Sequence, residues 1–142
     1  MVDIVYEADL KPESRDAVLD GLIAFNRSQT PEFKGTLANV GLLLKHPETG
    51  QTDGGLTGRI SFGWLFIELL FVPERLRGQG VGSQLMAQAE AVAREHDCVG
   101  IWLDTFSFQA PGFYQKLGYA VFGEIGNYPP GHSRFFLHKH LS

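Results

Sequence analysis

The sequence predicts an α/β fold in which strands and helices alternate along a single domain. Apolar runs of strand length, such as residues 64–72, are followed by segments whose apolar residues recur at helical spacing, such as residues 80–96. Short stretches rich in glycine, proline and asparagine separate these segments. A chain of 142 residues fits one hydrophobic core, so we expect one domain over residues 1–142.

The first half of the chain is expected to form a strand, a helix and a hairpin. Residues 2–6 read as a short strand, and residues 26–35 as a short helix or an irregular loop. Residues 38–45 and 54–62 read as the two strands of a hairpin. The helix between them is expected over Pro12–Phe25, with an apolar face made by Val18, Leu19, Leu22, Ile23 and Phe25.

The second half is expected to form a longer alternation of strands and helices. Pro111 suits the first position of a short helix that ends at Lys116, and Gly118 suits its left-handed cap. The other expected elements are strands over Trp64–Val72, Val99–Asp104, Tyr119–Ile125 and Ser133–Leu141, and a long helix over Gly80–His96.

Composition and charge exclude several classes of protein. Hydrophobic residues make up 44% of the chain and charged residues 20%, as in ordinary soluble domains. The net charge of −4 and the lack of a basic cluster argue against a nucleic-acid partner. The first residues carry acids where a signal peptide would carry bases, and no stretch approaches the ~20 apolar residues of a membrane span. We therefore expect a cytoplasmic protein without membrane attachment.

The segment after the strand at 64–72 contains glycines at alternate positions, Gly78, Gly80 and Gly82, and it leads into the first turn of a helix. Glycine lets several backbone N–H groups converge, and the helix N-terminus favours negative charge, so this loop suits a phosphate or pyrophosphate. A Walker loop would need Lys and then Ser or Thr after its last glycine, and a dinucleotide fingerprint would need glycine in place of Ser83. Both of these nucleotide motifs are excluded.

The remaining pattern, Arg77-x-x-Gly80-x-Gly82, resembles the acyl-CoA pyrophosphate loop of the GNAT superfamily of N-acyltransferases. A second run, Phe113-Tyr-Gln-Lys-Leu-Gly-Tyr119, is similar to the F-Y-x-K-x-G-F/Y run of that family. The resemblance covers nearly the whole chain and is weakest over residues 26–35. It implies one GNAT domain with a mixed, mostly antiparallel sheet of about seven strands, flanked by helices and splayed between strands four and five.

In that family the acyl-CoA thioester lies in the splay, and an amine attacks it directly. The resemblance implies that the backbone of Leu70, Phe71 and Val72 pairs with the pantetheine arm of acetyl-CoA, while the side chains of Leu70 and Val72 belong to the core. Ser107 stands where many members have Asn, and with Gln109 it is expected to contact the same arm. The pyrophosphate is expected on Arg77, Gly78, Gln79, Gly80, Val81, Gly82 and Ser83.

Tyr114 matches the family tyrosine whose hydroxyl protonates, or donates a hydrogen bond to, the departing thiolate. A nearby donor stabilises the CoA leaving group as its charge develops. The alternative is a core aromatic beside Phe113. We favour the catalytic role.

The general base is left open among three residues. Glu68 interrupts an apolar strand, and simple alternation puts it on the same side as Phe66, Leu70 and Val72. A carboxylate there needs either a proton or a charged partner. Catalysis, binding of a cationic substrate and pairing with an arginine all remain possible for Glu68. The other two candidates for the general base are Asp104 and His132. Glu68, Asp104 and His132 are also expected to bind the acceptor.

Other reactive side chains are interpreted as structural. Cys98 precedes a strand in an apolar context and reads as packing rather than as a nucleophile. His138 and His140 share a strand face but have no evident third ligand, so no metal is assigned. Aromatic residues that could line a substrate cavity, although each is favoured as core, are Trp64, Phe66, Phe106 and Phe108.

The sequence therefore predicts an acetyl-CoA-dependent N-acetyltransferase that acts on a primary amine. The acidic chain and a splay closed by residues 128–132 favour a small cationic acceptor over a protein tail. The alternatives are a peptide acetyltransferase and a CoA-binding regulatory module without catalysis. A homodimer is also expected, because the family commonly dimerises and the last strands offer apolar surface at Val121, Phe122, Phe135, Phe136 and Leu137.

Overall fold

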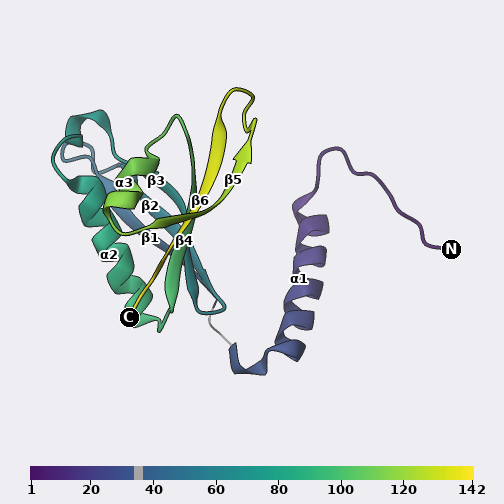
Figure 1. Ribbon diagram of the computed structural model, residues 1–142. Helices are drawn as coiled ribbons and strands as arrows, with labels where there is room; N and C mark the ends of the chain where they lie inside the picture. Colours follow the sequence, from purple (N-terminus) through teal and green to yellow (C-terminus); the bar gives the residue numbers. More distant parts are fainter. Residues whose placement is uncertain (34–36) are drawn as a thin grey trace. The chain divides into compact units, whose positions relative to one another are not determined.

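The computed structural model describes residues 1–33 and 37–142 (Figure 1). It contains two compact units whose boundary lies among the undescribed residues 34–36. None of the helices in the described residues combines the length and the apolar character of a membrane span. The expectation of one domain over residues 1–142 stays a prediction.

The first unit contains helix α1 (Pro12–Gln29) and a short 3₁₀ turn, η1 (Pro31–Phe33). Pro12 stands at the start of α1, where its missing N–H costs nothing. The helix runs four residues beyond the predicted end at Phe25, because residues 26–29 are polar but contain no helix breaker. It ends at Thr30, whose hydroxyl donates to the Asn26 carbonyl at 2.6 Å, just before Pro31. Of the segment 26–35, Lys34 and Gly35 lie outside the described residues.

The strand predicted over residues 2–6 is wrong, because residues 1–7 form no regular secondary structure. Alternating apolar side chains favour an extended chain, but a strand also requires a partner in a ladder. The end of this segment instead forms hydrogen bonds with the start of α1. The Glu7 carboxylate accepts hydrogen bonds from the Lys11 N–H at 2.9 Å and the Ser14 hydroxyl at 3.2 Å. A carboxylate at this position complements the helix dipole.

The second unit contains a six-stranded sheet in the order β1-β2-β3-β4-β6-β5 (Figure 1). All neighbouring strands are antiparallel except the parallel pair β3–β4. The prediction of about seven strands therefore exceeds the described sheet by one, the segment at residues 2–6. The strands are β1 (Ala38–Lys45), β2 (Thr52–Ser61), β3 (Trp64–Phe71), β4 (Gly100–Phe106), β5 (Ala120–Gly126) and β6 (Ser133–His140).

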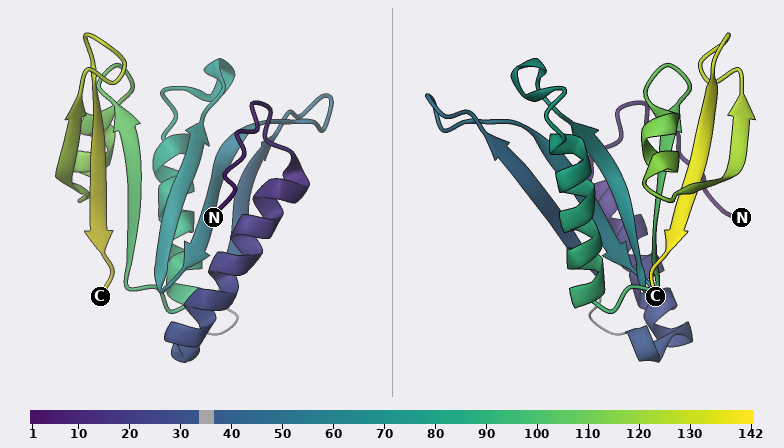
Figure 2. Two further views of the ribbon diagram at one scale, coloured as in Figure 1. Left: turned by 90° about the vertical axis from the view of Figure 1, so that its right-hand side faces the viewer. Right: turned by 60° about the vertical axis from the view of Figure 1, so that its left-hand side comes forward.

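Two helices contribute to the core of this unit. α2 (Val81–Glu95) lies along the sheet and contacts β1 to β4, while α3 (Pro111–Lys116) contacts β5 (Figure 2). The core that they share with one face of the sheet includes Leu65, Ile101, Leu103, Leu137 and, from α2, Met86.

Cys98 lies at the edge of this core and is buried. Burial, and then the charge of Asp97, raises the pKa of its thiol. A buried thiol with a raised pKa is a poor nucleophile, which fits the structural interpretation of this residue.

Candidate active site

The separation of β3 from β4 is the central feature of the site. The two strands pair from Trp64 with Gly100 to Ile67 with Leu103, and the ladder ends there. Both strands continue: β3 still pairs with β2 as far as Phe71, and β4 with β6 as far as Phe106. Neighbours on the outer sides thus hold two strands whose inner edges have parted, which confirms the predicted splay.

A β-bulge at Glu68 shapes the β3 side of this opening. Ile67 pairs with Gly58 and Leu69 with Thr57, which leaves Glu68 as an extra residue in β3. The extra residue reverses the alternation of side chains. Leu70 therefore packs on the same core as Leu65 and Ile67.

Glu68 is consequently on the opposite face from Leu70 and Val72, and the prediction that these three share a side is wrong. Its carboxylate accepts a hydrogen bond from Arg59 Nη1 at 2.9 Å and lies 3.4 Å from the Thr57 hydroxyl. The Arg59 guanidinium lies over the Phe66 ring, 5.0 Å from its centroid. The arginine partner foreseen as one alternative for Glu68 is therefore present. The pair is open to solvent, with 55% of the Arg59 side chain and 46% of the Glu68 side chain exposed.

Asp104, in β4, is held in a more shielded network. Its two carboxylate oxygens accept from Arg134 Nε at 3.0 Å and Nη2 at 2.8 Å, and Arg134 Nη1 donates to the Tyr128 hydroxyl at 2.8 Å. The hydrogen bond to Asp104 outweighs desolvation and raises the pKa of Arg134. Only 26% of the Arg134 side chain and 16% of the Asp104 side chain are exposed. Asp104 thus ties the start of β6 and the loop before it to β4.

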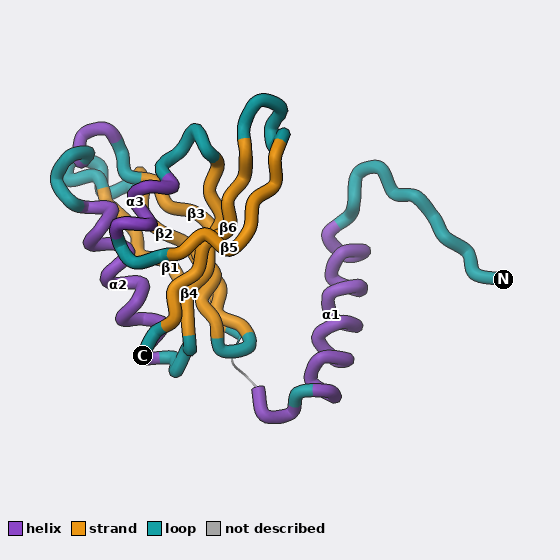
Figure 3. Tube along the Cα trace, in the orientation of Figure 1, coloured by secondary structure: helices purple, strands orange, loops and turns teal. Residues whose placement is uncertain are grey.

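The loops after β4 and before β6 are bound to each other at the end of the sheet where β3 and β4 finish (Figure 3). The Ser107 N–H donates to the Ser133 carbonyl at 2.8 Å, and the Ser107 hydroxyl accepts from the Ser133 N–H at 3.0 Å. The same hydroxyl lies 3.4 Å from His132 Nδ1. Gln109 Oε1 accepts from the Phe106 N–H at 2.8 Å and the Thr105 hydroxyl at 2.9 Å. Ser107, Gln109 and His132 thus have roles within the protein that the motifs did not reveal.

The glycine loop leaves backbone donors at the start of α2. Gly78 and Gly80 both have φ of 76°, a left-handed conformation that favours glycine. Gly80 is the N-cap and supplies no side chain to cap the helix. The first intrahelical bond from this position is Gln84 N–H to the Gly80 carbonyl at 3.0 Å. The N–H groups of residues 81–83 precede it and therefore have no partner within the helix.

Gly82 has a different role from its two neighbours. A Cβ there would lie 3.2 Å from the edge of the Phe113 ring, so this glycine lets α3 approach the start of α2. The two sequence motifs are thus in direct contact. At the other end of the loop, Arg77 Nε donates to the Val72 carbonyl at 3.1 Å. That carbonyl, expected to pair with the pantetheine arm, already accepts one hydrogen bond from within the chain.

Tyr114 is carried by α3 and is 9% exposed. Its ring contacts those of Phe113 and Tyr119, with centroids 5.0 and 6.3 Å apart. Burial raises the pKa of its hydroxyl, and the negative charge of Asp104 raises it further. The hydroxyl is therefore protonated at neutral pH and can donate a hydrogen bond or a proton. Both the catalytic reading and the core reading of Tyr114 fit this geometry.

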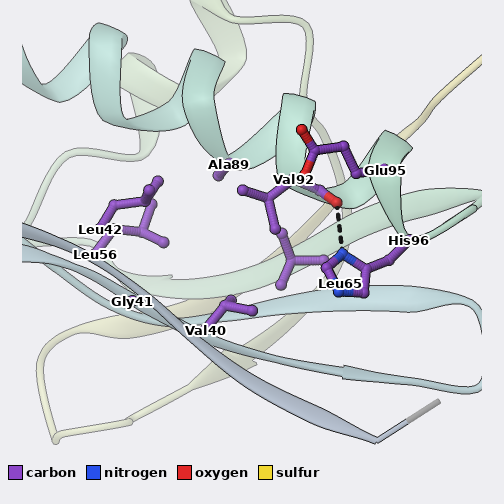
Figure 4. Close-up of a pocket in the computed structure, with 9 residues that line it drawn as sticks. All are labelled: Val40, Gly41, Leu42, Leu56, Leu65, Ala89, Val92, Glu95 and His96. Carbon is purple, nitrogen blue, oxygen red and sulfur yellow. Dashed lines mark hydrogen bonds between the residues drawn. The ribbon is translucent and has the colours of Figure 1, made fainter. Parts of the chain in front are cut away.

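The chain also has an apolar groove of about 320 Å³ away from these residues, between β1 to β3 and α2 (Figure 4). At its end, His96 Nδ1 lies 3.0 Å from the Val92 carbonyl. None of the predicted site residues lines it; the lining residues are Val40, Gly41, Leu42, Leu56, Leu65, Ala89, Val92, Glu95 and His96.

The histidine pair of β6 is part of an aromatic cluster. The His138 and His140 rings lie 6.4 and 5.2 Å from that of Trp64. In the described parts of the chain, no group of three or more His, Cys, Asp or Glu side chains is arranged to hold a metal ion.

Comparison with known proteins gives related acetyltransferases. A blasticidin-S acetyltransferase from Streptomyces morookaense is 47% identical over 95 residues, which are 66% of this chain and 70% of that protein. The crystal structure of an acetyltransferase from Bacillus cereus superposes with a TM-score of 0.82 at 38% identity, covering 96% of this chain and 98% of the other.

A Bacillus anthracis acetyltransferase solved in complex with acetyl coenzyme A superposes with a TM-score of 0.61 at 25% identity, covering 79% of this chain and 68% of the other. The family profile described as acetyltransferase (GNAT) family matches residues 17–119, which include the glycine loop and the Tyr114 motif. The chain therefore belongs to the GNAT family of acetyltransferases.

Proposed function

We propose that the protein transfers the acetyl group of acetyl-CoA to a primary amine of a small cationic acceptor. The observation that carries this proposal is the opening between β3 and β4. It lies beside a glycine loop that leads into α2, where the N–H groups of residues 81–83 have no partner within the helix. The similar Bacillus anthracis acetyltransferase, solved with acetyl coenzyme A, supports the choice of co-substrate.

Acetyl-CoA has two kinds of binding surface in this proposal. The pantetheine arm lies along the inner edge of β3, where the backbone of Leu70 and Phe71 is no longer paired to β4. The pyrophosphate lies at the N-terminus of α2, where the N–H groups of residues 78–83 and the helix dipole favour an anion. Ser107 and Gln109 act by shaping the loop that borders the arm.

In the proposed reaction the amine nitrogen attacks the thioester carbon, the carbon–sulfur bond breaks, and the amine loses one proton as the amide forms. Tyr114 donates its proton, or a hydrogen bond, to the departing sulfur, which leaves as free CoA thiol. The raised pKa keeps this hydroxyl protonated as the thiolate develops, so it is available to donate a hydrogen bond to the sulfur.

Glu68 is proposed as the group that receives the amine proton and attracts the cationic acceptor. An exposed ion pair such as Arg59–Glu68 contributes only about 0–1 kcal/mol, so an acceptor ammonium can replace Arg59. Asp104 is bound by two hydrogen bonds in a more shielded pair, and we therefore assign it to holding the Tyr128 loop. His132, bonded to Ser107, borders the acceptor from that loop.

A small acceptor is favoured over a peptide because a relative that shares 95 aligned residues is named for acetylation of blasticidin S. The net charge of −4 favours a cationic acceptor. A catalytically silent CoA-binding module is less favoured, because Tyr114 and Glu68 are both present. The homodimer stays a prediction, and the exposed Val121 and Phe122 side chains support it. The expectation that Leu137 offers apolar surface is wrong, because its side chain is fully buried in the core.

A panel of acceptors tests the function directly. We expect release of free thiol from acetyl-CoA with small polyamines or other multiply charged amines, and little release with neutral or anionic acceptors. Peptides with free N-termini or lysines form the second arm of the panel. Turnover only with neutral or anionic compounds would contradict the proposed acceptor, and acetyl-CoA binding without any turnover would favour the silent module.

Replacing Tyr114 by Phe is expected to lower turnover roughly 10²-fold or more while the affinity for acetyl-CoA changes little, because the hydroxyl acts as the thiolate forms. The raised pKa further predicts that wild-type activity shows no loss from Tyr114 ionisation below the ordinary tyrosine value. Steady-state kinetics and calorimetry measure the two effects.

The matched control for this substitution is Tyr119→Phe. The Tyr119 hydroxyl is buried without a hydrogen-bond partner among the described residues, so its removal should leave activity and stability unchanged or slightly raise stability. If Tyr114→Phe kept the wild-type turnover that is expected of Tyr119→Phe, Tyr114 would be assigned to the core.

Replacing Glu68 by Gln is expected to lower the rate most at neutral pH and less at higher pH. An alkyl amine with a pKa of about 10.4 is mostly protonated at pH 7, and free amine becomes abundant as the pH rises. The rate of the variant should therefore approach that of the wild type with increasing pH. The control Glu48→Gln, in the turn after β1, should follow the wild-type profile, whereas a Glu68→Gln deficit of constant size across the pH range would exclude the base role.

A further inference from the structure

The segment that connects β3 to the glycine loop is anchored to the β1–β2 hairpin through Arg75. This residue lies in the 3₁₀ turn η2 (Glu74–Leu76). Its Nε donates to Asp53 Oδ2 at 3.0 Å, and its Nη2 donates to Asp53 Oδ1 at 3.0 Å. Nη2 also lies 3.5 Å from the Lys45 carbonyl oxygen at the end of β1. One guanidinium thus spans the turn and two strands.

The geometry of this contact makes it stronger than an ordinary surface pair. Two parallel hydrogen bonds between a guanidinium and a carboxylate fix orientation as well as distance. The Arg75 side chain is 31% exposed and that of Asp53 is 28% exposed, against 55% and 46% for Arg59 and Glu68. Water therefore screens the Arg75–Asp53 pair less.

The hairpin is a firm anchor because β2 lies directly against the end of β3. A Cβ on Gly54 would lie 2.7 Å from the Phe71 carbonyl oxygen and 2.7 Å from Pro73 Cδ. Only a residue without a side chain allows this approach. Asp53, the preceding residue, is thereby held close to the start of η2.

Hydrogen bonds to the backbone around Arg75 connect the turn η2 to the glycine loop. Gln79 Nε2 donates to the Arg75 carbonyl at 3.1 Å, so the residue between Gly78 and Gly80 is tied back to the turn. On the same stretch, the Arg77 N–H donates to the Glu74 carbonyl at 3.2 Å. The loop is therefore connected to Asp53 through Arg75 by short, directional contacts.

We propose that Arg75 is a positioning residue that, through Asp53, holds the glycine loop in the conformation that receives the pyrophosphate of acetyl-CoA. This inference rests on the proposed function, in which the loop binds that pyrophosphate. Arg75 does not contact the reacting atoms. Its loss should weaken recognition of the pyrophosphate and leave the acetyl-transfer step unchanged.

The test compares two acetyl donors that differ in the group that the loop recognises. Acetyl-CoA carries the pyrophosphate, and S-acetyl-pantetheine does not. For Arg75→Ala we expect the KM for acetyl-CoA to rise roughly tenfold, kcat to stay within about twofold, and kcat/KM for S-acetyl-pantetheine to stay at the wild-type value. Arg75→Lys should give an intermediate KM, because an ammonium cannot form the paired hydrogen bonds.

The reversed pair, Asp53→Arg with Arg75→Asp, should recover most of the affinity for acetyl-CoA lost by either single variant. This rescue distinguishes the contact from the side chains themselves. As a control for ion pairs elsewhere, Glu90→Gln removes the negative charge that pairs with Lys139 at 2.8 Å and should leave the KM for acetyl-CoA unchanged.

Calorimetry separates failure of this inference from failure of the proposed function. Absence of acetyl-CoA binding by the unaltered chain would overturn the function and the inference together. Wild-type binding that persists in Arg75→Ala would overturn the inference alone. Equal losses with both acetyl donors would also overturn it, because a general defect of the fold would then explain the kinetics.

Discussion

The second unit of this acetyltransferase is organised around a parallel pair of strands that is allowed to separate. β3 and β4 are the parallel neighbours in an otherwise antiparallel sheet, and their ladder stops at Ile67 and Leu103. Backbone groups that would normally be satisfied by the neighbouring strand become available there. The opening survives because β2 and β6 continue to pair with the outer edges of both strands.

Several local features work together at this opening. The bulge at Glu68 brings Leu70 back to the core, so the end of β3 is anchored by its side chains and its backbone edge stays accessible. The contact between Gly82 and the Phe113 ring joins the start of α2 to α3, which carries Tyr114. The proposed phosphate loop is therefore packed against the helix that carries the proposed proton donor, although their motifs are separate in the sequence.

Much of this fold could be predicted from local patterns. The helical spacing after Gly80, the apolar run before it and Pro111 each predicted an element with nearly correct bounds. Residues 2–6 misled the prediction because their pattern specifies an extended chain but not a partner. Alternation alone cannot reveal an inserted residue, so the bulge was missed and Glu68 was wrongly placed on the same face as Leu70 and Val72. The expectation that the Leu70 and Val72 side chains belong to the core is confirmed.

The partners of the charged site residues could not be predicted from local sequence patterns. Asp104 and Arg134 lie thirty positions apart and meet only because β4 and β6 are neighbours. An arginine partner for Glu68 was one of the alternatives considered, but only the β2–β3 register identifies it as Arg59. The catalytic role of Tyr114 was implied by resemblance, and that of Glu68 was one of the alternatives read from its place in an apolar strand; both stay predictions.

The most direct measurement of the central idea is amide hydrogen exchange with and without acetyl-CoA. If the parted edge of β3 and the start of α2 receive the co-substrate, the amides of residues 69–72 and 78–83 should exchange more slowly in its presence, while those of the β1–β2 turn at residues 46–51 should not change. Adenosine 3′,5′-bisphosphate, which lacks the pantetheine arm, should not protect residues 69–72. Acetyl-CoA binding that leaves both segments unprotected would contradict the account.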